Sequence, residues 1–188
     1  MPILPKESDF YPDDLFELST ADAPWEIAHL RSRQEKMVAR LLREAGKPFF
    51  LPQIEKKKKS SGRTFVSHLP LFPGYIFVRR VPGLREALWR TSAVANMLEV
   101  PDQPQLTAEL LQIRELQASG AILTPIDQLG PGDTVGINEG PFAGYTGVVL
   151  KERNSLRLIV SVSILHKSVA VEFPRDLLTR KDPSEAVS

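Results

Sequence analysis

The residues best suited to chemistry in this 188-residue chain are basic, and they are concentrated in one segment. Residues 25–65 contain eleven Lys and Arg against four Glu, a net charge of +7, whereas residues 1–24 carry −5 and the remainder is nearly balanced. The four consecutive lysines Lys56 to Lys59 must face solvent in any fold. Such a cluster is typical of a surface that contacts phosphate groups, although a solvated helix face has the same composition.

The chain shows no pattern that would support catalysis. It contains no P-loop, no G-x-S-x-G, no H-E-x-x-H and no cysteine nucleophile. Its three histidines are isolated in sequence, and we expect packing or surface roles for His29, His68 and His166. The lack of cysteine excludes disulfides and favours a reducing cytoplasm, and no stretch approaches the roughly 20 apolar residues of a membrane span. We therefore expect a protein that is not an enzyme and that needs no cofactor, metal or membrane.

The segment Leu69 to Val78 packs three aromatic and four aliphatic residues into ten positions. A Pro-Gly pair at its centre predicts a rigid turn that opens into a strand, and period-two alternation then separates the aromatic from the aliphatic side chains. One interpretation is a central strand buried on both sides. The other is an exposed apolar patch that docks a partner. The residues of this patch would be Phe72, Tyr75 and Phe77, with Ile76 and Val78 in the core.

The elements that position these residues form an α+β domain over residues 25–118. The order strand, helix, two strands, helix, strand and helix implies an antiparallel sheet with helices packed on it. Ser32 and Glu35 have the spacing of a capping box for the first helix, and Thr107 is expected to cap the last. Residues 49–54 are expected to form the second strand and residues 56–63 the tip of a hairpin, and the strand after this tip leads into the segment Leu69 to Val78.

The composition also predicts the segments that flank this domain. Residues 1–24 are rich in proline and acidic residues, which predicts a disordered acidic leader that could shield the basic segment behind it. Residues 119–130 are the predicted linker to a second domain.

Residues 131–180 consist of short strand candidates separated by glycine turns, which predicts a small antiparallel barrel of five strands, followed by a tail over residues 181–188. Phe142 lies at a loop apex, where it would either plug the barrel or contact a partner. The valines expected to fill the barrel are Val135, Val148, Val160 and Val169.

Three segments of the chain resemble the NusG family of transcription elongation factors. They are Trp25 through the Arg-Ser-Arg-Gln-Glu start of the first helix, Leu71 to Val78, and Gly140 to Val149, which resembles a KOW motif. The resemblance extends over residues 25–180. The resemblance implies an α+β N-terminal NGN domain, with an antiparallel sheet flanked by helices, joined to a small all-β KOW domain, an SH3-like five-stranded barrel.

The resemblance also implies partners and contact residues. The NGN domain of this family binds the β′ clamp helices of RNA polymerase and contacts non-template DNA, and the KOW domain recruits a small-subunit ribosomal protein or Rho. The implied polymerase contacts are Phe72, Tyr75, Phe77 and Met97. The implied DNA contacts are Arg31, Arg33, Gln34, Lys56, Lys57, Lys58, Lys59 and Arg63, and the implied KOW contact is Phe142.

The expected function is that of a bacterial, cytoplasmic and monomeric factor that suppresses pausing and termination. The basic helix start and the hairpin resemble specialised RfaH-like members of the family, which favours an antiterminator. Such members can refold the barrel sequence as helices, but Gly144, Gly147 and the β-branched runs predict strands here. The alternative is an RNA-binding ribosomal or rRNA-maturation KOW protein, which would need positive charge on the barrel, whereas residues 128–188 are neutral.

Overall fold

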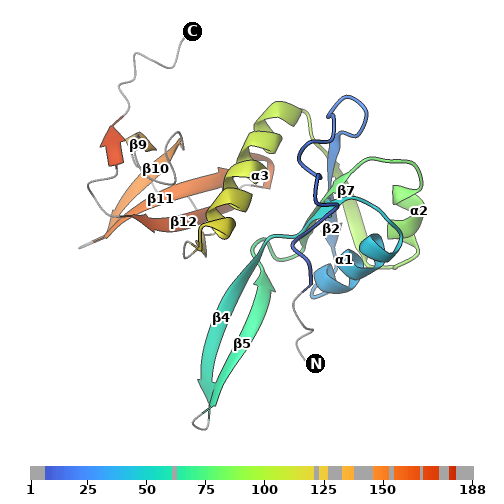
Figure 1. Cartoon of the computed structure of the whole chain (residues 1–188), viewed down its shortest axis with the longest axis horizontal. Helices are drawn as coiled ribbons and strands as arrows, with labels where there is room; N and C mark the ends of the chain where they lie inside the picture. Colours follow the sequence, from blue (N-terminus) through green and yellow to red (C-terminus); the bar gives the residue numbers. More distant parts are fainter. Residues whose placement is uncertain are drawn as a thin grey trace. The chain divides into compact units, whose positions relative to one another are not determined.

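The computed structural model describes residues 7–60, 63–120, 123–126, 133–137, 146–152, 155–165, 167–173 and 178–180. The chain divides into two compact units, residues 1–107 and 108–188. The first unit holds a five-stranded sheet and a two-stranded hairpin, and the second holds a six-stranded sheet (Figure 1). The long helix α3, Gln103–Ala118, crosses the boundary between the two units.

The elements of the first unit follow the predicted order, with one additional strand before β2 and with four strands in place of the predicted two between the first two helices. They are β1 Phe10–Tyr11, β2 Trp25–Leu30, α1 Glu35–Glu44, β3 Phe49–Phe50, β4 Gln53–Ser60, β5 Arg63–Pro70, β6 Tyr75–Arg79, α2 Leu84–Trp89 and β7 Val94–Glu99.

The five-stranded sheet has the strand order β1-β3-β6-β2-β7, and every pair in it is antiparallel. Its core on one face is built with α1 and α2, because Val38 and Leu42 of α1 and Leu88 of α2 join the buried side chains of the strands. Ile76 and Val78 of β6 are fully buried in this core, as predicted. Alternation along β6 therefore leaves Tyr75 and Phe77 for the opposite face.

The prediction that residues 1–24 are a disordered leader is wrong for residues 7–24. Phe10 and Tyr11 pair with Phe50 and Phe49 of β3, which makes β1 an edge strand of the sheet. Leu15 is fully buried. Prolines and scattered acidic residues leave this segment without a sustained periodicity, and the burial of its apolar residues depends on contacts with strands far along the chain.

The two predicted helix caps are also wrong. Gln34 is the N-cap of α1 and makes no side-chain cap hydrogen bond, because Arg33 adopts a left-handed φ of 63° and puts a turn between Ser32 and the helix. Helix α3 begins at Gln103, before Thr107. Pro104 is tolerated there because the first turn of a helix does not need its N–H.

The second unit is built of strands rather than helices, which confirms that prediction. Its elements are β8 Leu123–Ile126, β9 Asp133–Ile137, β10 Thr146–Glu152, β11 Ser155–Val162, a 3₁₀ turn Ser163–Leu165, β12 Lys167–Phe173 and β13 Leu178–Arg180. The strand order is β13-β9-β10-β11-β12-β8, with antiparallel pairs throughout.

Two details of the second unit differ from the predictions. Strand β8 lies inside the expected linker and pairs with β12, so that part of residues 119–130 belongs to the sheet. Val148 pairs with Ile159, which places it on the sheet face opposite Val160 and Val169. Phe142 lies outside the described residues. No helix within the described ranges is long and apolar enough to cross a membrane.

Candidate functional site

The face of the five-stranded sheet that points away from α1 and α2 carries rows of large side chains. The register pairs Tyr75 with His29, and Phe77 with Ile27 on one side and Phe50 on the other. Cross-strand partners share a face, so β2, β3 and β6 together build one aromatic surface. We call this surface the aromatic face.

The N-terminal segment packs onto the aromatic face through Phe16. The Phe16 ring lies 5.7 Å from the Trp25 ring and 5.3 Å from the Phe50 ring, the latter in an edge-to-face arrangement. The chain of contacts continues from Phe50 to Phe77 at 6.3 Å and from Phe77 to Phe72 at 5.8 Å. These centroid distances are in the favourable range for aromatic pairs. Phe16 was not among the residues predicted from the sequence, although the adjacent apolar residues Leu15 and Phe16 indicated that the segment could pack.

The predicted exposure of Phe72 and Phe77 is wrong. Phe72 is 2% exposed and Phe77 is fully buried. Both belong to the aromatic cluster that includes Phe16 and Phe50. Tyr75 is partly exposed, and its ring stacks on His29 at 4.9 Å with an interplanar angle of 21°. Of the three aromatic residues predicted for docking, Tyr75 is therefore the one that presents its side chain to solvent.

Met97 lies on the opposite face of the sheet from Tyr75. It pairs with Ala28 and packs against the core formed with α1 and α2. The neighbouring Leu98 pairs with Ile27 and belongs to the aromatic face. Met97, a predicted polymerase contact, therefore lies on the other face of the sheet from Tyr75, since one position along a strand exchanges its two faces.

The turn before Tyr75 is fixed by the start of α1. Glu35 is 5% exposed, and its Oε1 accepts a hydrogen bond from the Gly74 N–H at 2.7 Å. Gly74 has a φ of 85°, which only glycine adopts without strain, and its carbonyl accepts the Leu30 N–H at 2.7 Å. These bonds hold the Pro-Gly turn against β2 and the first helix, and they set where β6 begins.

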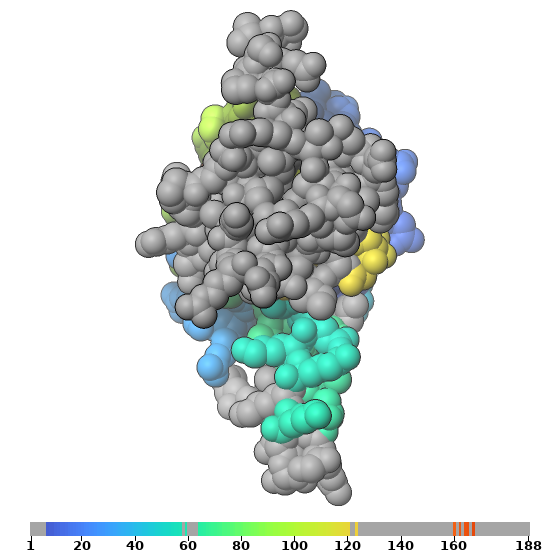
Figure 2. Space-filling model, turned by 90° about the vertical axis from the view of Figure 1, so that its left-hand side faces the viewer, coloured from blue at the N-terminus to red at the C-terminus, as the bar shows by residue number. Residues whose placement is uncertain are grey.

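The basic residues predicted to contact DNA are divided between two places in the first unit. Arg31 and Arg33 are exposed in the turn between β2 and α1, and Gln34 is half-buried beside them. In the β4–β5 hairpin, Lys56, Lys57 and Lys59 are exposed, while the side chains of Lys58 and Arg63 lie outside the described part. The hairpin is coloured cyan in Figure 2.

Part of the basic surface of α1 is neutralised by the N-terminal segment. The Glu7 carboxylate is 7% exposed and accepts hydrogen bonds from Arg40 at 2.5 Å and from Arg43 at 3.4 Å. Burial lowers the pKa of the Lys36 ammonium, and the nearby carboxylates of Glu7 and Glu35 oppose this shift. The N-terminal segment therefore compensates part of the charge of α1, whereas Arg31 and Arg33 of the turn and the described lysines of the hairpin remain exposed.

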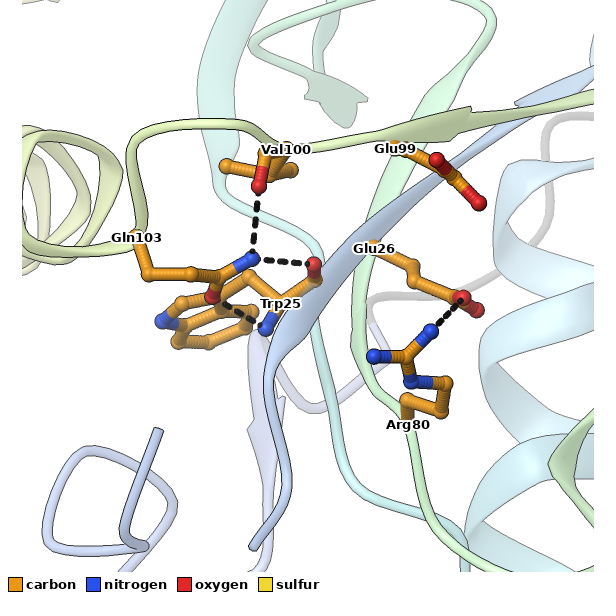
Figure 3. A pocket seen from close by; sticks show the side chains of 6 residues that line it. All are labelled: Trp25, Glu26, Arg80, Glu99, Val100 and Gln103. Atoms are coloured by element: carbon orange, nitrogen blue, oxygen red, sulfur yellow. Dashed lines mark hydrogen bonds and ion pairs between the residues drawn. The ribbon is translucent and has the colours of Figure 1, made fainter. Parts of the chain in front are cut away.

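A small pocket lies between β2 and the residues after β7, lined by Trp25, Glu26, Arg80, Glu99, Val100 and Gln103 (Figure 3). Its volume of about 130 Å³ is below the several hundred Å³ of ordinary ligand sites. The Gln103 amide accepts the Trp25 N–H and donates to the Trp25 and Val100 carbonyls. Glu26 pairs with Arg85 at 2.9 Å and with Arg80 at 3.5 Å. These bonds fasten α3 and α2 to β2. Within the described residues, no group of His, Asp and Glu could hold a metal ion.

A family model described as "Transcription termination factor nusG" matches residues 23–113. The transcription termination/antitermination protein NusG of Pseudomonas aeruginosa is 30% identical in an alignment that covers 79% of this chain and 93% of that protein. The chain belongs to the NusG family. NusG proteins of Escherichia coli strain K12 and of Buchnera aphidicola subsp. Baizongia pistaciae are each 29% identical, with 79% of this chain and 91% of each relative covered.

NusG membership assigns the chain to the transcription termination/antitermination factors, and its relatives are named for transcription rather than for a catalysed reaction. A solved structure described as "Crystal Structure of MjSpt4:Spt5 complex conformation B" covers 84% of this chain at 18% identity. Its TM-score of 0.25 is too low to support an argument about structure.

Proposed function

We propose that this NusG-family protein binds the β′ clamp helices of RNA polymerase through its first unit and acts there as an elongation and antitermination factor. The observation that carries the proposal is the aromatic face, which ends in the partly exposed pair of Tyr75 and His29. An exposed aromatic residue held by a rigid turn is the kind of residue that dominates binding energy at protein interfaces.

The docking surface that we propose differs from the sequence prediction in its composition. Tyr75 and His29 make the direct contacts, and Phe72 and Phe77 support them from beneath. A stacked pair fixed on two neighbouring strands loses little side-chain freedom on binding, which favours affinity.

The basic turn and the hairpin are proposed to contact non-template DNA in the elongation complex. Arg31 and Arg33 are exposed at the start of α1, and the hairpin carries four lysines in succession. Cations of this kind bind phosphates without sequence preference, while Gln34 or Arg33 could contact base edges. Bridging polymerase and DNA would disfavour paused states, and a coupling of about 1–3 kcal/mol would change pause occupancy several-fold to about a hundredfold.

The second unit is proposed to be the KOW domain, with Phe142 as the contact for a small-subunit ribosomal protein or Rho. We further propose that the protein is a specialised, RfaH-like antiterminator, because of its basic helix start and lysine-rich hairpin. The strands of the second unit support a KOW fold in place of a helical form. The RNA-binding alternative is less favoured because residues 128–188 carry no net charge.

Retention of core RNA polymerase by the immobilised chain tests the docking proposal. Tyr75→Ala is expected to weaken binding about tenfold or more, because it removes an exposed aromatic anchor, whereas Tyr75→Phe should retain most of the affinity. Trp89→Ala is the matched control, since Trp89 is 54% exposed on α2 and is not part of the proposed contact. Equal retention of polymerase by Tyr75→Ala and Trp89→Ala would refute the docking assignment.

A further inference from the structure

The β4–β5 hairpin exposes two apolar side chains at neighbouring positions. Phe65 is 54% exposed and Val66 is 50% exposed. The hairpin is a two-stranded sheet of its own, with eight cross-strand pairs from Gln53↔Pro70 to Ser60↔Arg63. Adjacent residues of a strand point to opposite faces, so Phe65 marks one face of the hairpin and Val66 marks the other.

The register also separates the charges of the hairpin onto these two faces. Phe65 is paired with Lys58, and the next pair on the same face is Lys56 with Ser67. This face includes no acidic position, because its members are residues 54, 56, 58 and 60 of β4 and residues 63, 65, 67 and 69 of β5.

The face of Val66 is different because it contains Glu55. The Glu55 carboxylate lies 3.2 Å from Lys57 Nζ and 3.9 Å from His68 Nε2. Part of the positive charge on this face is therefore compensated within the hairpin itself. By register, Phe65 shares its face with lysine positions and with no acidic position, whereas Val66 shares its face with Glu55.

We propose that the Phe65 face binds an unpaired stretch of nucleic acid, with the Phe65 ring stacked on a base and Lys56 and its same-face neighbours against the phosphates. The proposal builds on the function proposed above, in which the hairpin contacts DNA. It adds the face of the hairpin that binds the strand and the residue that stacks on a base.

The combination of one exposed ring and several cations favours this ligand over the alternatives. Base faces are accessible in a single strand but are covered by stacking in a duplex, and base–aromatic stacking tolerates any sequence. A stable protein interface buries roughly 800 Å² of surface on each partner, whereas a single exposed ring covers much less. The lysines supply the phosphate contacts that a neutral partner would not use.

Binding of the full chain to labelled oligonucleotides of about 12 nucleotides tests the proposal by fluorescence anisotropy. The same sequence is used as single-stranded DNA, as single-stranded RNA and as duplex DNA. The wild-type chain is expected to bind the single strands more tightly than the duplex, and the DNA and RNA arms identify which strand is preferred. Phe65→Ala should weaken single-strand binding about 5- to 150-fold, and Phe65→Trp should restore it.

Val66→Ala is the matched control, because it removes an equally exposed apolar side chain from the other face. It is expected to change the affinity by less than about twofold, since the stacking ring remains. Circular dichroism of each variant confirms that the fold is retained.

The salt dependence separates stacking from charge. Phe65→Ala should leave the slope of log affinity against log salt unchanged, whereas Lys56→Ala should reduce it by about 0.7. Lys57→Ala should reduce the slope less, because Glu55 already compensates Lys57.

Four results would overturn the proposal. They are equal losses for Phe65→Ala and Val66→Ala, no loss for Phe65→Ala, a wild-type preference for duplex, and no wild-type binding to any of the three oligonucleotides. Unchanged oligonucleotide binding by Phe65→Ala together with weaker retention of polymerase would assign the ring to a protein contact instead. The oligonucleotide assay contains no polymerase, so its outcome is independent of the Tyr75→Ala experiment.

Discussion

Among single residues, Glu35 has an unexpected role. Its spacing from Ser32 suggests a local cap, yet its carboxylate accepts the Gly74 N–H from the turn before β6. The left-handed φ of Arg33 moves Ser32 away from the helix end, which frees the Glu35 side chain for this long-range bond. The orientation of the turn that presents Tyr75 thus depends on the first residue of α1.

Replacement of Glu35 tests this dependence. Glu35→Ala should lower the free energy of unfolding of the first unit by about 1–3 kcal/mol, because the partly buried Gly74 N–H loses its partner. Glu35→Gln should cost less, since an amide oxygen still accepts the bond. Urea unfolding followed by tryptophan fluorescence measures the change, because both Trp25 and Trp89 lie in the first unit.

Glu44→Ala is the control for this experiment, since Glu44 is exposed at the other end of α1 and should change stability by no more than about 0.5 kcal/mol. A Glu35→Ala variant as stable as Glu44→Ala would show that the bond to Gly74 does not hold the turn.

Among the elements, the N-terminal segment changes the description of the first unit most. Residues 7–24 supply an edge strand, the buried Leu15, the ring of Phe16 on Trp25 and Phe50, and the carboxylate that pairs with Arg40 and Arg43. Arg79 lies 4.6 Å from the Trp25 ring and donates to the Leu18 carbonyl, which ties the segment to β6 as well. The segment is therefore part of the fold and covers part of the aromatic face.

Removal of the Phe16 ring tests the structural role of the segment. Phe16→Ala should destabilise the first unit by about 2–3 kcal/mol, less than the 3–5 kcal/mol of a fully buried phenylalanine because Phe16 is partly exposed. Thermal or urea unfolding, again followed by tryptophan fluorescence, gives the difference.

Phe65→Ala removes the same ring from an exposed site and should leave stability nearly unchanged. Similar unfolding midpoints for Phe16→Ala and the wild type would mean that residues 7–24 are a mobile leader after all.

For the whole molecule, the main structural result is that each unit has its own sheet and that the second unit is made of strands. Strands β11 and β12 share seven paired positions, and Val160 and Val162 are buried. A change to helices would have to break this ladder and remove both valines from their present contacts. We therefore expect the second unit to remain a sheet.

Hydrogen exchange of the full chain measures this persistence. The amides of residues 156–162 should be strongly protected, and the protection should be the same with and without core RNA polymerase. Loss of protection in these residues when polymerase is added would indicate that the second unit refolds on binding.

The strands, the turn before β6 and the exposed lysine run could be predicted from the sequence. Alternation predicted strands after Gly74 and over the second unit, the Pro-Gly turn predicted the start of β6, and the lysine run predicted an exposed hairpin tip. These signals depend on neighbours in the chain, which is why they can be found without a structure.

Which side chains are exposed to a binding partner depends on the tertiary structure. Phe72 and Phe77 are buried and belong to an aromatic cluster with Phe50 and Phe16, and Met97 packs against the core built with the helices because of its pairing with Ala28. Residues 7–24 are ordered through contacts with β3, α1 and Trp25. Burial and register arise from contacts between residues that are distant in sequence, and local patterns carry no record of those contacts.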